Sequence, residues 1–142
     1  MNINFGRMAL GGVAGTIAMT VVGLFGAPMM GMPPMNPAEM LAGAMGGNMA
    51  LGWAGHFMIG ITLAAAYAAV AASMIPGPPP IRGAVFSLAP WLAAQLMVMP
   101  MMGMPLFSGS MAMAMGSLVG HIVYGAVLGA IYGEPAASAA AA

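Results

Sequence analysis

The two histidines are the side chains best suited to chemistry, and they occur in matching surroundings. The matched residues are Gly55, His56, Gly60, Leu63 and Tyr67, and 65 positions later Gly120, His121, Gly125, Leu128 and Tyr132. On an α-helix, the histidine, the second glycine, the leucine and the tyrosine of each set fall on one face. An imidazole is unfavourable next to lipid, so each face is expected to look inward, toward other helices.

Two interpretations of the histidines stay open. In the first, each ring forms a hydrogen bond with a carbonyl or hydroxyl of a neighbouring helix, and glycines such as Gly60, or Gly116 and Gly120, allow close packing. In the second, His56 and His121 are a symmetric pair of ligands. They would hold a metal ion such as copper or, with less support, a haem between two imidazoles.

Methionine is concentrated next to these histidine-bearing segments. Fifteen of the 20 methionines lie in residues 29–49 and 97–115, and each window contains the hexapeptide Pro-Met-Met-Gly-Met-Pro, at 28–33 and 100–105. Thioethers and imidazoles suit Cu(I) or Ag(I), although methionine also fills irregular, adaptable surfaces. The predicted soft-metal ligands are His56, His121, Met29, Met30, Met32, Met101, Met102 and Met104.

Other chemistry has little support. The chain has no cysteine, lysine or aspartate, which excludes thiol chemistry, cysteine metal sites and a serine–histidine–aspartate triad. Two arginines are too few for nucleic-acid binding. Glu39 follows Asn36 and Pro37 in a capping-box pattern, so it is expected to cap a short helix ending near Met45. We therefore expect a protein that is not an enzyme.

Composition places these residues in a membrane protein. Only 3% of the 142 residues are charged, against about 25% in soluble domains. Long apolar runs predict four transmembrane helices, at residues 8–27, 49–75, 83–99 and 111–132. The proline-rich residues 76–80 are expected to form a tight, non-helical connection. Pro90 is expected to kink the third span, and Gln95 in the same span to form an interhelical hydrogen bond.

The repeated motifs predict an internal duplication. Repeat one covers residues 7–75 and repeat two residues 82–133, each consisting of an arginine, a helix, a Met-Pro link and a helix with Gly-His. The fold class is thus an all-α, four-helix membrane bundle of two tandem hairpins with pseudo-twofold symmetry along the membrane normal. Arg7 and Arg82 place both termini in the cytoplasm under the positive-inside rule. Residues 136–142 are a low-complexity tail, expected to be disordered.

Three segments resemble a family of small bacterial membrane proteins known only as a domain of unknown function. They are residues 51–60 (LGWAGHFMIG), 82–86 (RGAVF) and 120–133 (GHIVYGAVLGAIYG). The resemblance implies a four-helix inner-membrane protein and no particular activity. From the residues themselves we expect an accessory or structural subunit that docks on other membrane subunits or on itself. The alternative is a Cu(I) binding or transfer protein with its site on the outward side.

Overall fold

The computed structural model describes residues 3–135, and every regular element in that range is a helix. This confirms the all-α prediction. Four helical segments are long and apolar enough to cross a membrane, as the sequence predicted. They are Phe5–Met29, Met49–Met74, Pro79–Met101 and Met111–Tyr132. The predicted low-complexity tail at 136–142 lies outside the described residues.

Three of the spans are built from several helical pieces that continue one another. The first span consists of α1 (Phe5–Val21), the π-helical turn η1 (Val22–Gly26) and α2 (Ala27–Met29). The second consists of α4 (Met49–Ala66), the π-helical turn η2 (Tyr67–Ala71) and α5 (Ala72–Met74). The third consists of α6 (Pro79–Phe86), α7 (Leu88–Ala93), the π-helical turn η3 (Ala94–Val98) and α8 (Met99–Met101). The fourth is the single helix α9 (Met111–Tyr132).

The third span begins earlier than predicted, and it is interrupted close to the proline that was expected to kink it. It begins at Pro79, so the expectation that residues 76–80 are all non-helical was wrong. Prolines fit the first turn of a helix because its N–H groups have no intrahelical partner there. The span is also interrupted at Ser87, between α6 and α7. Pro90 has no N–H to offer the carbonyl four residues earlier, which accounts for a break at this point.

A short helix, α3 (Pro37–Ala44), lies in the link between the first two spans. The Asn36 side chain accepts hydrogen bonds from the N–H groups of Ala38 and Glu39, at 3.1 and 3.4 Å, so the predicted N-cap is confirmed. The reciprocal bond expected from the Glu39 carboxylate is absent among the described residues. Ala38 and Ala42 of α3 are buried against α4, where Gly52 provides the space.

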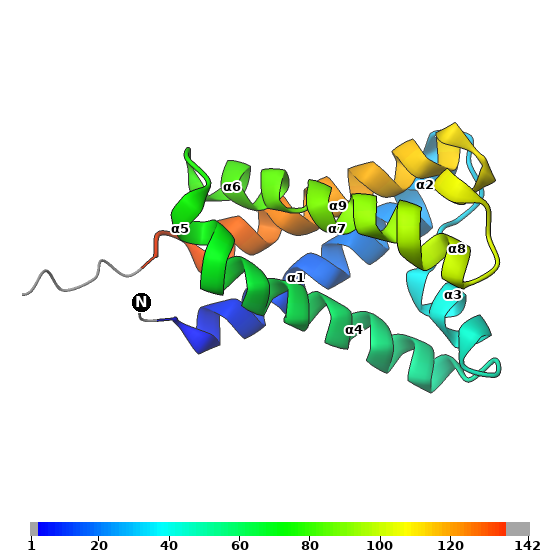
Figure 1. Ribbon diagram of the computed structural model, residues 1–142, viewed down its shortest axis with the longest axis horizontal. Coiled ribbons are helices and arrows are strands. Elements are labelled where there is room, and N and C mark those ends of the chain that lie inside the picture. Colours follow the sequence, from blue (N-terminus) through cyan, green and yellow to red (C-terminus); the bar gives the residue numbers. More distant parts are fainter. Residues whose placement is uncertain (1–2, 136–142) are drawn as a thin grey trace, which may run out of the picture.

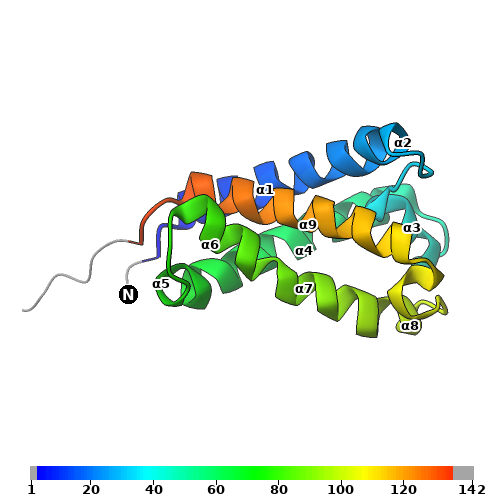
Figure 2. The ribbon, with the colours of Figure 1, turned by 90° about the horizontal axis from the view of Figure 1, so that it is seen from above.

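The helices pack as a bundle that is open on one side. The first span, α1, packs along both α4 and α9, and α9 packs along α1 and α6. Figure 2 shows α1 and α9 running side by side along the length of the molecule. The second and third spans, by contrast, meet at their tight connection and diverge from it, so that α4 and α7 are not a closely packed pair (Figure 1). At the far end of this opening, residues of the α3 segment and of the loop before α9 line the space between the two spans.

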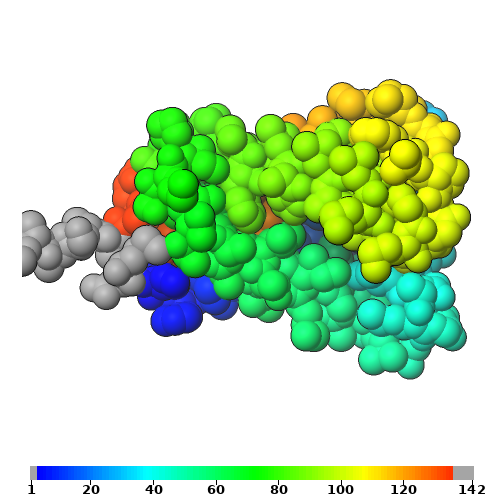
Figure 3. All heavy atoms as spheres, viewed as in Figure 1, coloured from blue at the N-terminus to red at the C-terminus, as the bar shows by residue number. Residues whose placement is uncertain are grey.

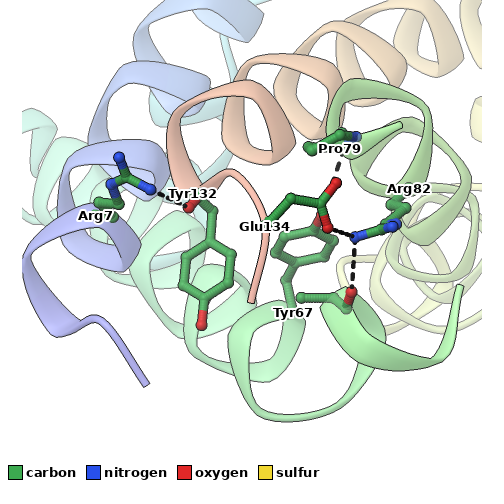
Figure 4. Close-up of polar contacts among 7 residues, drawn as sticks. Arg7, Tyr67, Pro79, Arg82, Tyr132 and Glu134 are labelled. Atoms are coloured by element: carbon green, nitrogen blue, oxygen red, sulfur yellow. Dashed lines mark hydrogen bonds and ion pairs between the residues drawn. The ribbon is translucent and has the colours of Figure 1, made fainter. Parts of the chain in front are cut away.

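The buried core of the bundle lies at the end where the second and third spans are connected. The buried core there contains Tyr67, Leu128 and Tyr132, together with small alanines of α4, η2 and α5. Arg7 donates to the Tyr132 carbonyl, and Arg82 bonds both the Ala72 carbonyl and Glu134, the last at 2.7 Å (Figure 4). Both arginines thus lie at the same end of the bundle as Glu134, as expected from an even number of crossings between them.

Candidate functional site

A cavity of about 680 Å³ lies between the diverging second and third spans. Its walls come from α1, α4, α7, η3 and α9, and residues 34–41 with Met104 and Ser108 complete it at the open end. Figure 3 shows the surface hollowed between the green α4 and the yellow-green third span, with blue atoms of the first span behind. The lining is mainly apolar. Its polar members are Thr16, Asn36, Glu39, His56, Gln95, Ser108, Ser117, His121 and Tyr124.

The two histidines, which are far apart in the sequence, line this one cavity. His56 is on α4 and is only 6% exposed. Its Nε2 lies 3.0 Å from the Thr20 hydroxyl of α1, which itself donates to the Thr16 carbonyl. The hydrogen bond to a hydroxyl of a neighbouring helix is the contact expected under the packing interpretation.

His121, on α9, makes a different kind of contact. Its Nδ1 lies 2.9 Å from the Ser117 carbonyl, one turn earlier on the same helix. A carbonyl can only accept, so Nδ1 carries the proton and Nε2 is a bare nitrogen. The expectation of a bond to a neighbouring helix is therefore wrong for His121. The structure brings both predicted ligands to one cavity while leaving part of each ring without a partner among the described residues.

A network of hydrogen bonds fixes the wall opposite His56. Gln95, 2% exposed, donates to the Ser117 hydroxyl at 3.0 Å and accepts from the Ser108 hydroxyl at 3.1 Å. The Trp91 indole N–H also reaches Ser117, at 3.1 Å. The predicted interhelical bond of Gln95 is confirmed. The network also holds Ser108 and Phe107 in the left-handed backbone region, which side chains other than glycine adopt at a cost.

One of the predicted methionine ligands lines the cavity and the others do not. Met104 lines the cavity with the histidines. Met29, Met30 and Met101 are 88%, 53% and 84% exposed, do not line it and thus lie away from the histidines. The tip of the Met32 side chain packs on Gly116 of α9, and Met102 is half-buried outside the cavity.

Sequence reasoning missed five other methionines that do line the cavity. They are Met19, Met35, Met40, Met99 and Met113. Met35 is held over the first span because its N–H donates to the Gly23 carbonyl at 2.9 Å. One signal was available for Met99, which lies on the same helix as Gln95 and one turn beyond it. Met19 and Met113 lie within predicted spans, and Met113 is four residues before Ser117 and eight before His121 on α9, so helical spacing was a signal for it as well. Met35 and Met40 come from a link whose path the sequence pattern did not define.

Comparison with known proteins places the chain in a family without assigning an activity. A model of the family of unknown function DUF6789 matches residues 4–141. The chain belongs to this family. The match confirms the resemblance inferred from the Gly-His segments, to an uncharacterised domain family. Searches of curated proteins and of solved structures found no match.

Proposed function

We propose that this DUF6789 protein is a small, non-enzymatic integral membrane protein that binds a membrane-soluble molecule in the cavity between α4 and α7. The observation that carries the proposal is the cavity itself, of about 680 Å³ with a mainly apolar lining and a few polar groups. Ligand sites typically occupy 300–1,000 Å³ with this kind of lining. In a membrane, the gap between the second and third spans would face the lipid, so an apolar ligand could enter sideways.

Binding is tested by blocking the cavity. Ala94 of η3 lines it, whereas Ala89 of α7 is an exposed residue of the same span that does not. Protein in lipid nanodiscs is incubated with a photoreactive apolar probe, and the labelled residues are mapped by mass spectrometry. We expect cavity-lining residues to be labelled in the wild type and in A89F, and the labelling to be lost in A94F. Equal labelling of all three proteins would contradict the proposal.

We also propose an orientation of the cavity in the membrane and an internal duplication of the chain. With the arginine end in the cytoplasm of a bacterial inner membrane, the cavity would lie toward the outward side. The duplication is supported by local geometry: η1 with α2 and η3 with α8 begin 72 residues apart. The glycine within each copy of the hexapeptide also has a positive φ, 77° at Gly31 and 76° at Gly103. Reactivity of single cysteines with impermeant reagents in intact cells would test the orientation.

Soft-metal binding is a second candidate function. Its support is that six methionines and both histidines line one cavity, with the Glu39 carboxylate available to balance a monovalent cation. The favoured ligand set is His56, His121, Met19, Met35, Met40, Met99, Met104 and Met113. Copper analysis of freshly purified protein, compared with a H56Q/H121N variant, tests it. Absence of Cu(I) uptake would refute this candidate, and absence of a haem absorbance band would refute the bis-histidine haem.

The role of accessory subunit remains a prediction. Its support is the small-residue packing of the bundle and the opening between α4 and α7, on which a helix of another membrane protein could pack. Purification in mild detergent should then yield a stoichiometric partner. Protein that purifies alone as a monodisperse monomer from native membranes would argue against it.

A further inference from the structure

The hydrogen-bonding state of His56 follows from its neighbour Thr20. The Thr20 hydroxyl oxygen lies 2.8 Å from the Thr16 carbonyl oxygen. Two oxygens at this distance need a proton between them, and only the hydroxyl has one. The hydroxyl therefore faces His56 with a lone pair, and the ring must donate from Nε2. A neutral His56 then has a bare Nδ1.

The two rings therefore adopt opposite tautomers, and each ring has one nitrogen without a proton. His56 donates from Nε2 and has a bare Nδ1, whereas His121 donates from Nδ1 and has a bare Nε2. Neither bare nitrogen has a hydrogen-bond partner in the part of the chain that the structure describes. Buried in an apolar bundle, both rings are expected to be neutral, because a charged imidazole is costly there.

The hydroxyl groups of the cavity do not supply the missing donors, and among the described residues the amide groups of Asn36 and Gln95 form no hydrogen bond with either ring. Each hydroxyl that lines it already donates to a protein acceptor. The four bonds are Thr16 to the Gly12 carbonyl, Ser117 to the Ala114 carbonyl, Ser108 to Gln95 Oε1 and Tyr124 to the Gly60 carbonyl. Glu39 adds a carboxylate, which can only accept. The bare ring nitrogens and the Glu39 carboxylate are thus hydrogen-bond acceptors to which the hydroxyl groups of the cavity do not donate.

On the basis of the proposed binding function, we infer the class of ligand: an amphiphile with an apolar body and a head group that carries two hydroxyl donors. The two hydroxyls satisfy the bare nitrogens of His56 and His121, and the apolar body occupies the remaining volume beside the methionines. A head group with acceptors only, such as an ether or a ketone, would leave both nitrogens unpaired. Buried unpaired acceptors are unfavourable, so the site discriminates between the two kinds of head group.

The test uses two probes with one carbon skeleton. 4-Hexylresorcinol has two hydroxyls, and its dimethyl ether has none. Binding to the full chain in nanodiscs is measured by equilibrium dialysis, with protein-free nanodiscs correcting for partition into lipid. We expect the diol to bind at least about tenfold more tightly than the ether, which corresponds to the loss of one to two hydrogen bonds.

Variants and spectra identify the atoms involved. H56Q and H121N each retain a donor N–H for the bond that the histidine makes within the protein and remove the bare nitrogen, so each should reduce the preference for the diol. Nitrogen-15 spectra of histidine-labelled protein should show one protonated and one bare nitrogen in each ring. The diol should shift the two bare-nitrogen signals, and the ether should not. A purely structural role of the histidines would leave these signals unchanged.

The outcomes separate this inference from the proposed function. If both probes bind equally and A94F abolishes both, the cavity binds ligands but the inferred head group is wrong. If uptake of both probes is the same in the wild type and A94F, the proposed function fails as well. If Ag(I), and not the diol, shifts the bare-nitrogen signals, the acceptors serve a metal ion and the inference is overturned.

Discussion

Two glycine-to-alanine substitutions on α9 should differ in their effect on stability: one should destabilise the protein and the other should not. Gly125 and Gly116 are both buried on this helix, but they face different neighbours. A β-carbon on Gly125 would overlap the Gly83 carbonyl oxygen and lie 2.8 Å from Ser87 Cβ, so α6 would have to move away. A β-carbon on Gly116 would meet flexible thioether groups, 2.8 Å from Met32 Cε and 3.3 Å from Met35 Sδ.

The magnitudes follow from this contrast. Alanine is favoured over glycine within a helix by about 0.5–1 kcal/mol. Overpacking against a backbone costs about 1–3 kcal/mol. G125A should therefore lower the free energy of unfolding by about 0.5–2 kcal/mol. G116A should leave it unchanged or raise it by up to about 1 kcal/mol, because the thioether groups of Met32 and Met35 can rotate away.

Reversible unfolding in mixed micelles, followed by far-UV circular dichroism, measures both values. G83A provides a control from the other side of the same contact, because its β-carbon would overlap the Gly125 carbonyl oxygen. It should behave like G125A, and the G83A/G125A double variant should show a non-additive effect since the two residues share one contact. Equal stability changes for G125A and G116A would refute the reasoning that backbone contact at this crossing decides the outcome.

Three further predictions concern polar contacts. E134Q removes a surface ion pair with Arg82 in which the carboxylate is 64% exposed, so chemical denaturation should show a loss below about 1 kcal/mol that decreases with salt. Q95L leaves Ser117 and its neighbours short of a partner in a buried network, so thermal unfolding should show a loss of about 1–3 kcal/mol, and Q95N a smaller one. N36A removes the cap of the short helix α3, so hydrogen exchange in residues 37–44 should accelerate about fivefold while N36D retains protection.

The sequence predicted the spans well, and their ends less well for identifiable reasons. Residues 111–132 were predicted correctly because Ser110 precedes the run and Gly133 follows it. The first span was predicted to begin at residue 8, after Arg7, but it begins at Phe5. Arg7 is tolerated inside the helix because its guanidinium reaches the end of α9 and bonds the Tyr132 carbonyl. No local pattern encodes a contact across 125 residues.

The candidate site was predictable in its two histidines but not in most of its methionines or in its shape. The spacing of His56 and His121 placed both on inward faces, and both line the cavity. Their different partners depend on side chains of other elements, such as Thr20 on α1, which a periodic pattern does not relate to them. The exposed positions of Met29 and Met101 follow from the turn that each hexapeptide makes at its glycine, which directs these side chains away from the bundle.

The cavity itself arises from a departure from the proposed symmetry. In two equivalent hairpins, the contact of α1 with α9 would have a counterpart between α4 and the third span. The first contact is closely packed and the second is open. The first link is longer than the second by the segment that forms α3, and α3 packs on α4 through Ala38 and Ala42. Residues of α3 also line the cavity where the second and third spans diverge, so the segment that has no counterpart in the second link lies at the place where the proposed symmetry fails.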